Sequence, residues 1–96
     1  MDIQNVTEIA RGRWPMIFDR LGIKVPKRGK HGPCPLCGDG VDRFHFDDKE
    51  GRGTWHCRKC ADKSAGDGLS MVSRYFDVSC YHAVRLVVST LGRHGK

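Results

Sequence analysis

The sequence predicts a small α+β domain in which an antiparallel β hairpin with two Cys-x-x-Cys turns is flanked by short N-terminal helices and C-terminal amphipathic helices. Three observations support this class. The chain has 96 residues, enough for one domain with a modest core. Two stretches in its middle alternate polar and aromatic residues around a turn-like segment, as the strands of a hairpin do. Apolar residues near both ends recur at helical spacing instead.

Residues 1–23 are expected to form two short helices that lead into the hairpin. Asn5, with Glu8 three residues later, resembles an N-cap with its reciprocal acid and would open the first helix. The apolar face of this helix would comprise Val6, Ile9 and Ala10. Pro15 suits the first turn of a second helix, which Gly22 should end. The core-facing residues of the second helix would be Trp14, Ile17, Phe18 and Leu21.

Residues 24–63 would hold the hairpin and its cysteine turns. The stretch 24–32 is basic and rich in glycine and proline, so we expect an extended linker there. The stretches 43–46 and 52–57 alternate polar and aromatic residues, which predicts two strands. The turn-like segment 47–51 would join them. The central part of the chain is therefore predicted to be an antiparallel hairpin.

Residues 64–92 are expected to form two helices that pack on the hairpin. Asp67 is a suitable N-cap for a helix from 68 to 76, and Ser79 is a suitable N-cap for the last helix. Residues 93–96 resemble a frayed tail. All four segments would belong to one domain.

The last helix carries an apolar stripe at i, i+3, i+4, i+7, i+8 and i+11, which predicts an amphipathic helix. The residues of this stripe are Cys80, Ala83, Val84, Val87, Val88 and Leu91. Because Cys80 belongs to the stripe, we expect its thiol to be buried and not to bind metal. Gly92 should end the helix.

The charge of the chain favours an anionic partner. Seventeen Lys and Arg residues stand against eleven Asp and Glu, giving a formal net charge of +6. A nucleic acid suits such a charge, and an acidic membrane surface is the alternative. No apolar run approaches the ~18 residues of a membrane span, and the N-terminus lacks the apolar region of a signal peptide. We therefore expect an intracellular, cytoplasmic protein with no membrane partner.

Four of the five cysteines form two pairs, Cys34/Cys37 and Cys57/Cys60, which nineteen residues separate. This spacing is typical of structural zinc sites, in which each pair supplies two thiolates from one turn. Four thiolates around one zinc ion leave no open coordination position, which favours a structural role over catalysis. The predicted cofactor is one zinc ion in a four-cysteine site.

Three other arrangements fit the same residues. The two pairs also suit a redox dithiol pair or an iron–sulfur cluster. In the third arrangement a nearby histidine replaces one cysteine, and the candidates are His31, His45 and His56.

Basic residues near the cysteine pairs would offset the formal charge of about −2 that four thiolates give a zinc site. They are Arg43, Arg58, Lys59 and Lys63.

Alternation along the two strands separates an aromatic face from a polar face. Phe44, Phe46 and Trp55 share the aromatic face, which we expect to pack against the helices. The alternative is that these rings are exposed and stack on unpaired bases. The polar face would gather donors for phosphates and base edges, and its alternative is an ordinary solvated surface. The candidates on it are Arg43, His45, Arg52, Thr54 and His56, with Arg58 and Lys59 at its end.

Much of the chain closely resembles the zinc-binding domain of DNA primases of the phage and plasmid primase-helicase type. The resemblance is carried by HGPCPLCGDGVDRFHFDDKEGRGTWHC followed by AGDG, by the upstream ARGRWPMIFDRLGI and by the downstream CYHAVRLVVSTLG. It implies a zinc ribbon with flanking helices, in which zinc is held by Cys34, Cys37, Cys57 and Cys60. One departure is the stretch 61–64, because the family usually places glycine directly after the last cysteine.

The resemblance also implies a function. Such a domain binds single-stranded DNA template, helps to select the start site, and holds or delivers the RNA primer during DNA replication. Its partners would be primase catalytic and helicase domains, in cis or in trans. The analogy places the recognition surface on the hairpin, at Arg43, His45, His56 and Arg58.

The residues bear on three classes of function. A nucleic-acid-binding module is favoured. A protein-interaction module that docks on a helicase, polymerase or other replication protein is the alternative. An enzyme in its own right is disfavoured, since the sequence shows neither a carboxylate cluster nor the phosphate loop of a helicase. We expect no catalytic residue in this chain. We also expect the chain to form part of a DNA primase, which is a primer-synthesising nucleotidyltransferase.

Overall fold

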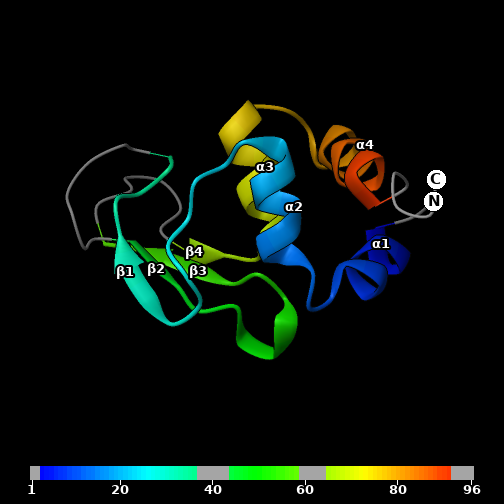
Figure 1. The fold of residues 1–96 in the computed structure, drawn as a ribbon. Helices are drawn as coiled ribbons and strands as arrows, with labels where there is room; N and C mark the ends of the chain where they lie inside the picture. The colour runs from blue at the N-terminus through cyan, green and yellow to red at the C-terminus, as the bar shows by residue number, and fades with distance from the viewer. Residues whose placement is uncertain (1–2, 37–43, 59–64, 92–96) are drawn as a thin grey trace.

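The computed structural model describes residues 3–36, 44–58 and 65–91. In these ranges the chain forms helices and an antiparallel four-stranded sheet (Figure 1). In chain order the elements are α1 (Ile3–Ala10), α2 (Trp14–Leu21), β1 (Lys30–Gly32), β2 (Phe44–Phe46), the 3-10 helix η1 (Lys49–Gly51), β3 (Trp55–Cys57), β4 (Ala65–Gly66), α3 (Gly68–Phe76) and α4 (Cys80–Leu91). The predicted small α+β class is confirmed.

The sheet has the order β1-β2-β3-β4, with every neighbouring pair antiparallel. The expected hairpin is its centre, formed by β2 and β3. The outer strands were not expected, since β1 lies in the stretch interpreted as a linker and β4 in the segment assigned to the last helices. The lead-in to β1 is fixed by the Gly29 N–H, which donates to the Phe46 carbonyl at 2.7 Å.

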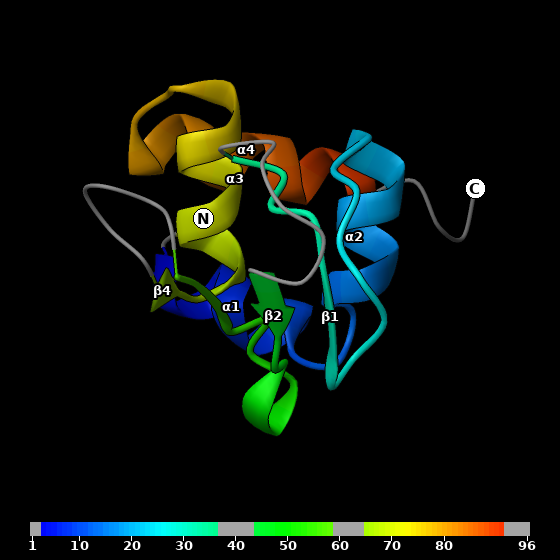
Figure 2. The same ribbon diagram turned by 90° about the vertical axis from the view of Figure 1, so that its left-hand side faces the viewer.

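Helices α2 and α3 lie against one face of the sheet, and α1 and α4 lie farther from it (Figures 1 and 2). The side chains that point toward the helices from β2 and β3 are buried, and they are Phe44, Phe46, Trp55 and Cys57. Phe46 meets Phe18 of α2 with ring centroids 5.7 Å apart, and Phe44 stacks on Trp55 at 5.8 Å. The aromatic residues of the hairpin therefore form the core, and the alternative of exposed stacking rings is wrong for these three.

The first helix differs from its prediction in two respects. It begins at Ile3, so Asn5 lies inside the helix and is not its N-cap. Val6 and Ala10 are buried as expected, but Ile9 is 42% exposed. The buried pair lies at i and i+4 on one face of α1, and α1 packs against α4.

The second helix follows its prediction. Pro15 lies in its first turn, and Gly22 ends it with the left-handed φ of 80° that glycine adopts without strain. The Ile23 N–H then donates to the Phe18 carbonyl at 2.9 Å, which closes the helix end. Trp14, Ile17 and Phe18 are buried.

Both C-terminal helices begin at their predicted caps. An Asp67 carboxylate oxygen accepts from the Ser70 N–H at 2.9 Å, and the Ser79 hydroxyl accepts from the His82 N–H at 3.1 Å. Most of the α4 stripe is buried from Ala83 onward, and Val88 is partly buried. Cys80 is exposed, so the prediction of a buried thiol is wrong. Other large apolar residues near the junction of α3 and α4 are exposed too, namely Tyr75, Phe76 and Tyr81.

Two further predictions concern the end of the last helix and membrane-spanning segments. The predicted stop at Gly92 lies outside them. Among the helices within them, none is long and apolar enough to cross a membrane.

Candidate metal centre and outer face of the sheet

Two of the four predicted zinc ligands lie at the same end of the sheet. Cys57 is the last residue of β3 and lies opposite Phe44 on β2. Gly32 is the last residue of β1 and also lies opposite Phe44, and Cys34 follows two residues later. Both cysteine side chains are buried. The sheet therefore brings the first cysteine of each pair to one end of the domain.

The backbone around Cys34 is arranged for a thiolate. The Leu36 N–H donates to the Cys34 sulfur at 3.3 Å. Donors of this kind stabilise the negative charge on a metal-bound sulfur and fix its orientation. The local geometry of the first cysteine turn is thus compatible with zinc ligation.

The remaining two predicted ligands, Cys37 and Cys60, lie outside the described residues. Within residues 3–36, 44–58 and 65–91, no group of three or more His, Cys, Asp or Glu side chains is placed to hold a metal ion. The described half of the donor set fits zinc by its chemistry, since two buried thiols at one end of the sheet match the ligand type of closed structural sites.

The outer face of the sheet carries a row of three histidines. The strand register places His31 opposite His45 and His45 opposite His56, so one histidine comes from each of β1, β2 and β3. The rings of His31 and His45 stack with centroids 4.5 Å apart and planes 15° apart. We refer to these three residues as the histidine row. It lies opposite the core face, because residues that alternate with buried strand neighbours point away from them.

The position of the histidine row argues against the alternative in which a histidine replaces one cysteine as a zinc ligand. His56 directly precedes Cys57 in β3, so the two side chains leave the strand on opposite faces. His45 lies across from His56 and shares its face. The histidines are therefore turned away from the buried sulfur of Cys57.

Of the residues predicted to contact nucleic acid, the structure brings His45 and His56 together. Arg58 is exposed and follows directly after β3, at the end of the sheet where Cys57 lies. His31 was not included in that prediction, although it is the third member of the row. The sequence of β1, Lys-His-Gly, does not alternate polar and apolar residues, so only its pairing with β2 reveals where His31 points.

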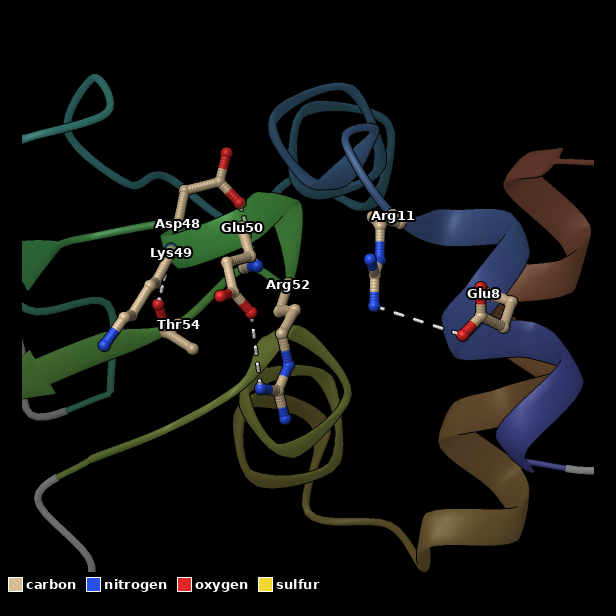
Figure 3. Close-up of polar contacts among 8 residues, drawn as sticks. Glu8, Arg11, Asp48, Lys49, Glu50, Arg52 and Thr54 are labelled. Carbon is tan, nitrogen blue, oxygen red and sulfur yellow. Dashed lines mark hydrogen bonds and ion pairs between the residues drawn. The ribbon is translucent and has the colours of Figure 1, made fainter.

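Arg52 and Thr54 lie at the other end of β3, in the turn that joins β2 to β3. The Thr54 hydroxyl accepts from the Lys49 N–H at 2.7 Å, and Arg52 forms an exposed ion pair with Glu50 at 4.0 Å (Figure 3). Gly53 between them has a φ of 71°, which interrupts the extended chain on which the predicted alternation depended. The other two candidates, Arg43 and Lys59, lie outside the described residues.

The turn itself is held by Asp48. Its side chain is buried, and one carboxylate oxygen accepts from the Gly53 N–H at 2.8 Å. Its own N–H donates to the Thr54 carbonyl at 2.9 Å. Asp48 adopts a left-handed φ of 49°, a conformation that Asp tolerates better than most residues. The hydrogen bonds of Asp48 thus stabilise the turn and fix how β2 and β3 pair.

Residues 29–69 match the protein-family model described as the zinc-binding domain of primase-helicase. The matched segment contains all four strands, both cysteine pairs and the Asp67 cap of α3. No solved structure matches the chain.

Proposed function

Because residues 29–69 match the model of the zinc-binding domain of primase-helicase, we propose that this chain binds single-stranded DNA template through the outer face of its sheet. In this proposal the domain serves start-site recognition and the synthesis or handoff of the RNA primer. Its partners are the primase catalytic and helicase domains. The proposal places the protein in the cytoplasmic DNA replication of a phage or another mobile element.

The observation that carries the proposal is the histidine row. Each imidazole offers a ring nitrogen that donates and one that accepts, so three aligned rings present several hydrogen-bonding groups to base edges. Ring faces also stack on unpaired bases, which are available only in a single strand. His31 and His56 are exposed and His45 is half-buried, so the row faces solvent.

The proposed zinc ligands are Cys34, Cys37, Cys57 and Cys60. Zinc bound by four thiolates supplies a closed structural cross-link with no open position for substrate. The chemistry at the surface then rests on side chains of the chain itself. We infer that Arg58, next to the end of β3, adds a cation beside the histidine row.

A single domain of this kind should bind DNA weakly. A row of three side chains reads few bases, and each good base contact contributes about 1–3 kcal/mol of discrimination. Tethering to a catalytic domain raises the effective concentration of template, so that weak preference becomes useful at a start site. This is why we propose that the domain works with primase and helicase domains and not alone.

The test measures fluorescence anisotropy of the zinc-loaded protein with short single-stranded DNAs of varied trinucleotide sequence at ~0.1 M salt. We expect preference for one trinucleotide, reduced at least tenfold by His45→Ala or His56→Ala, because a tenfold change corresponds to about 1.4 kcal/mol, within the range of one base contact. The matched control is His82→Ala, which removes an exposed histidine on α4. Equal affinity for all trinucleotides would refute the role in start-site recognition.

A protein-docking function is the second candidate, and a different observation favours it. Tyr75, Phe76 and Tyr81 are exposed near the junction of α3 and α4, and Tyr81 is 68% exposed. Exposed aromatic residues are enriched at protein interfaces. If this is the main function, Tyr81→Ser should weaken binding to a purified replicative helicase or polymerase and leave DNA binding unchanged. Unchanged binding to both proteins would argue against it.

A further inference from the structure

The segment that leads into β1 is strongly basic. It carries four cationic side chains within seven residues, all exposed, and we call them the basic segment: Lys24, Lys27, Arg28 and Lys30. No acidic residue occurs in the sequence between Asp19 and Asp39. Among the residues that the structure describes, no carboxylate forms an ion pair with these cations.

A groove lies beside this segment, between it and α2. Its volume is about 480 Å³, in the range of pockets that hold small molecules or parts of larger ones. Lys24, Lys27 and Arg28 contribute to its walls, and Asp19 is the one acid that lines it. Buried side chains close its floor, among them Phe18, Ile23 and Phe46. The groove combines a rigid apolar floor with a predominantly cationic rim.

The basic segment continues into the histidine row at the edge of the sheet. Lys30 directly precedes His31, the first member of the row, and the two side chains leave β1 on opposite faces. Lys30 lies opposite Phe46 and thus on the helix-covered side, while His31 is on the outer side. A chain that crosses the outer face from β3 to β1 therefore meets His31 and then, around the edge of β1, Lys30 and the groove.

From this continuity we infer that the basic segment binds the phosphate backbone of the nucleic-acid strand whose bases contact the histidine row. The inference rests on the proposed function and adds the path of the strand. Lysine and arginine bind phosphates whatever the base, so the segment supplies affinity and register, and the histidine row supplies sequence preference. The two surfaces thus have separable effects on binding.

A polyanion fits this segment better than a protein surface does. Protein interfaces have apolar cores from which charged residues, lysine above all, are depleted. Here the exposed groups are cations, while Val25 and Pro26 between them are half-buried. Phosphates along a strand present several negative charges in succession, and residues 24–30 present four cations in a short stretch of chain.

The test compares two double variants with the same change in net charge. Lys27→Gln with Arg28→Gln removes two cations of the basic segment. The control, Arg13→Gln with Arg85→Gln, removes two exposed cations outside it, at the start of α2 and on α4. All four positions are exposed, so both variants should fold, which circular dichroism checks. Lys27→Arg is the variant that should retain wild-type behaviour.

The readout is the slope of log affinity against log salt concentration for one oligonucleotide, from about 50 to 200 mM. Each phosphate contact on a single strand contributes about 0.7 to this slope, so loss of both contacts should reduce its magnitude by about 1.4. The trinucleotide preference should not change. The control should alter the slope by far less.

Two results would overturn the inference and leave the proposed function standing: an unchanged slope in the Lys27/Arg28 variant, or an equal loss in the control, while the wild-type protein still prefers one trinucleotide. A polyglutamate peptide that binds as tightly as DNA of equal charge would also overturn it, since the segment would then bind acidic chains of any kind. A wild-type protein without DNA binding would instead refute the proposed function itself.

Discussion

The contact between Trp14 and Gly68 offers the sharpest test of how the helices support the sheet. Gly68 is buried at the start of α3, and a Cβ added there would overlap three carbons of the Trp14 indole ring. Trp14 cannot easily yield, because it is buried and packs on Phe18 with ring centroids 5.5 Å apart. Gly68→Ala therefore places a methyl group where a rigid aromatic side chain already lies.

The expected loss of stability follows from two opposing terms. Overpacking of this kind costs about 3 kcal/mol, at the upper end of the usual range because the obstacle is a ring. Alanine is a better helix former than glycine and offsets about 1 kcal/mol. The net loss is about 2 kcal/mol, which should lower the melting temperature by roughly 8–16 °C in a domain of this size. Thermal unfolding at saturating zinc, followed by circular dichroism, measures it.

The ring is identified as the obstacle by a double-mutant cycle with Trp14→Phe. A smaller ring should relieve part of the overlap, so Gly68→Ala should cost less in the Trp14→Phe background than in the wild type. Additive effects of the two substitutions would refute the steric reasoning. Trp14 lies outside the family-matched segment and Gly68 inside it, so coupling between them would also show that the lead-in helices are an integral part of the fold.

Three further predictions concern the metal, the turn and the exposed thiol. Removal of zinc with a chelator should abolish the cooperative thermal transition, because metal binding contributes folding free energy to a small domain, and a transition retained at the same temperature would contradict this. Asp48→Ala should reduce the free energy of unfolding by about 1–3 kcal/mol, measured in urea, because the buried Gly53 N–H loses its acceptor. Asp48→Asn keeps an acceptor and should lose less than Asp48→Ala. Cys80 should react with a thiol reagent in the folded, zinc-loaded protein and Cys57 should not, and a Cys80→Ser variant that reacted as fast as the wild type would disprove the assignment.

The helices were predictable because their ends depend on local signals. Pro15, Gly22, Asp67 and Ser79 each act through hydrogen bonds or backbone angles within a few residues, which a sequence displays directly. Side-chain burial depends on more than periodicity. A stripe of apolar residues tells which side of a helix faces inward but not how far the covering surface extends, and Cys80 at the start of α4 is exposed.

Only the two central strands of the sheet were predictable from the sequence. For the same reason, only part of the proposed site was predictable. β1 and β4 show no alternation of polar and apolar residues in their sequences, and they form strands by pairing with β2 and β3. His31 therefore could not be placed from the sequence. The structure places His45 and His56 together on the outer face, as the alternation predicts. Arg52 and Thr54 instead lie in the turn, because a positive φ at Gly53 interrupts the extended chain before Trp55.

Short strands also explain why zinc ligands and a recognition surface belong on the same sheet. A one-residue slip in the pairing of a strand moves every side chain to the opposite face. In β3 such a slip would bring His56 into the core and expose Trp55 and Cys57. Strands of three residues have few backbone hydrogen bonds with which to resist it. In the proposed zinc-bound form, Cys34 and Cys57 tie the ends of β1 and β3 to one ion, so the register that buries the cysteines also keeps the histidine row aligned on the outer face. Zinc loss should then abolish sequence preference through register, although no histidine of the row is proposed to touch the metal.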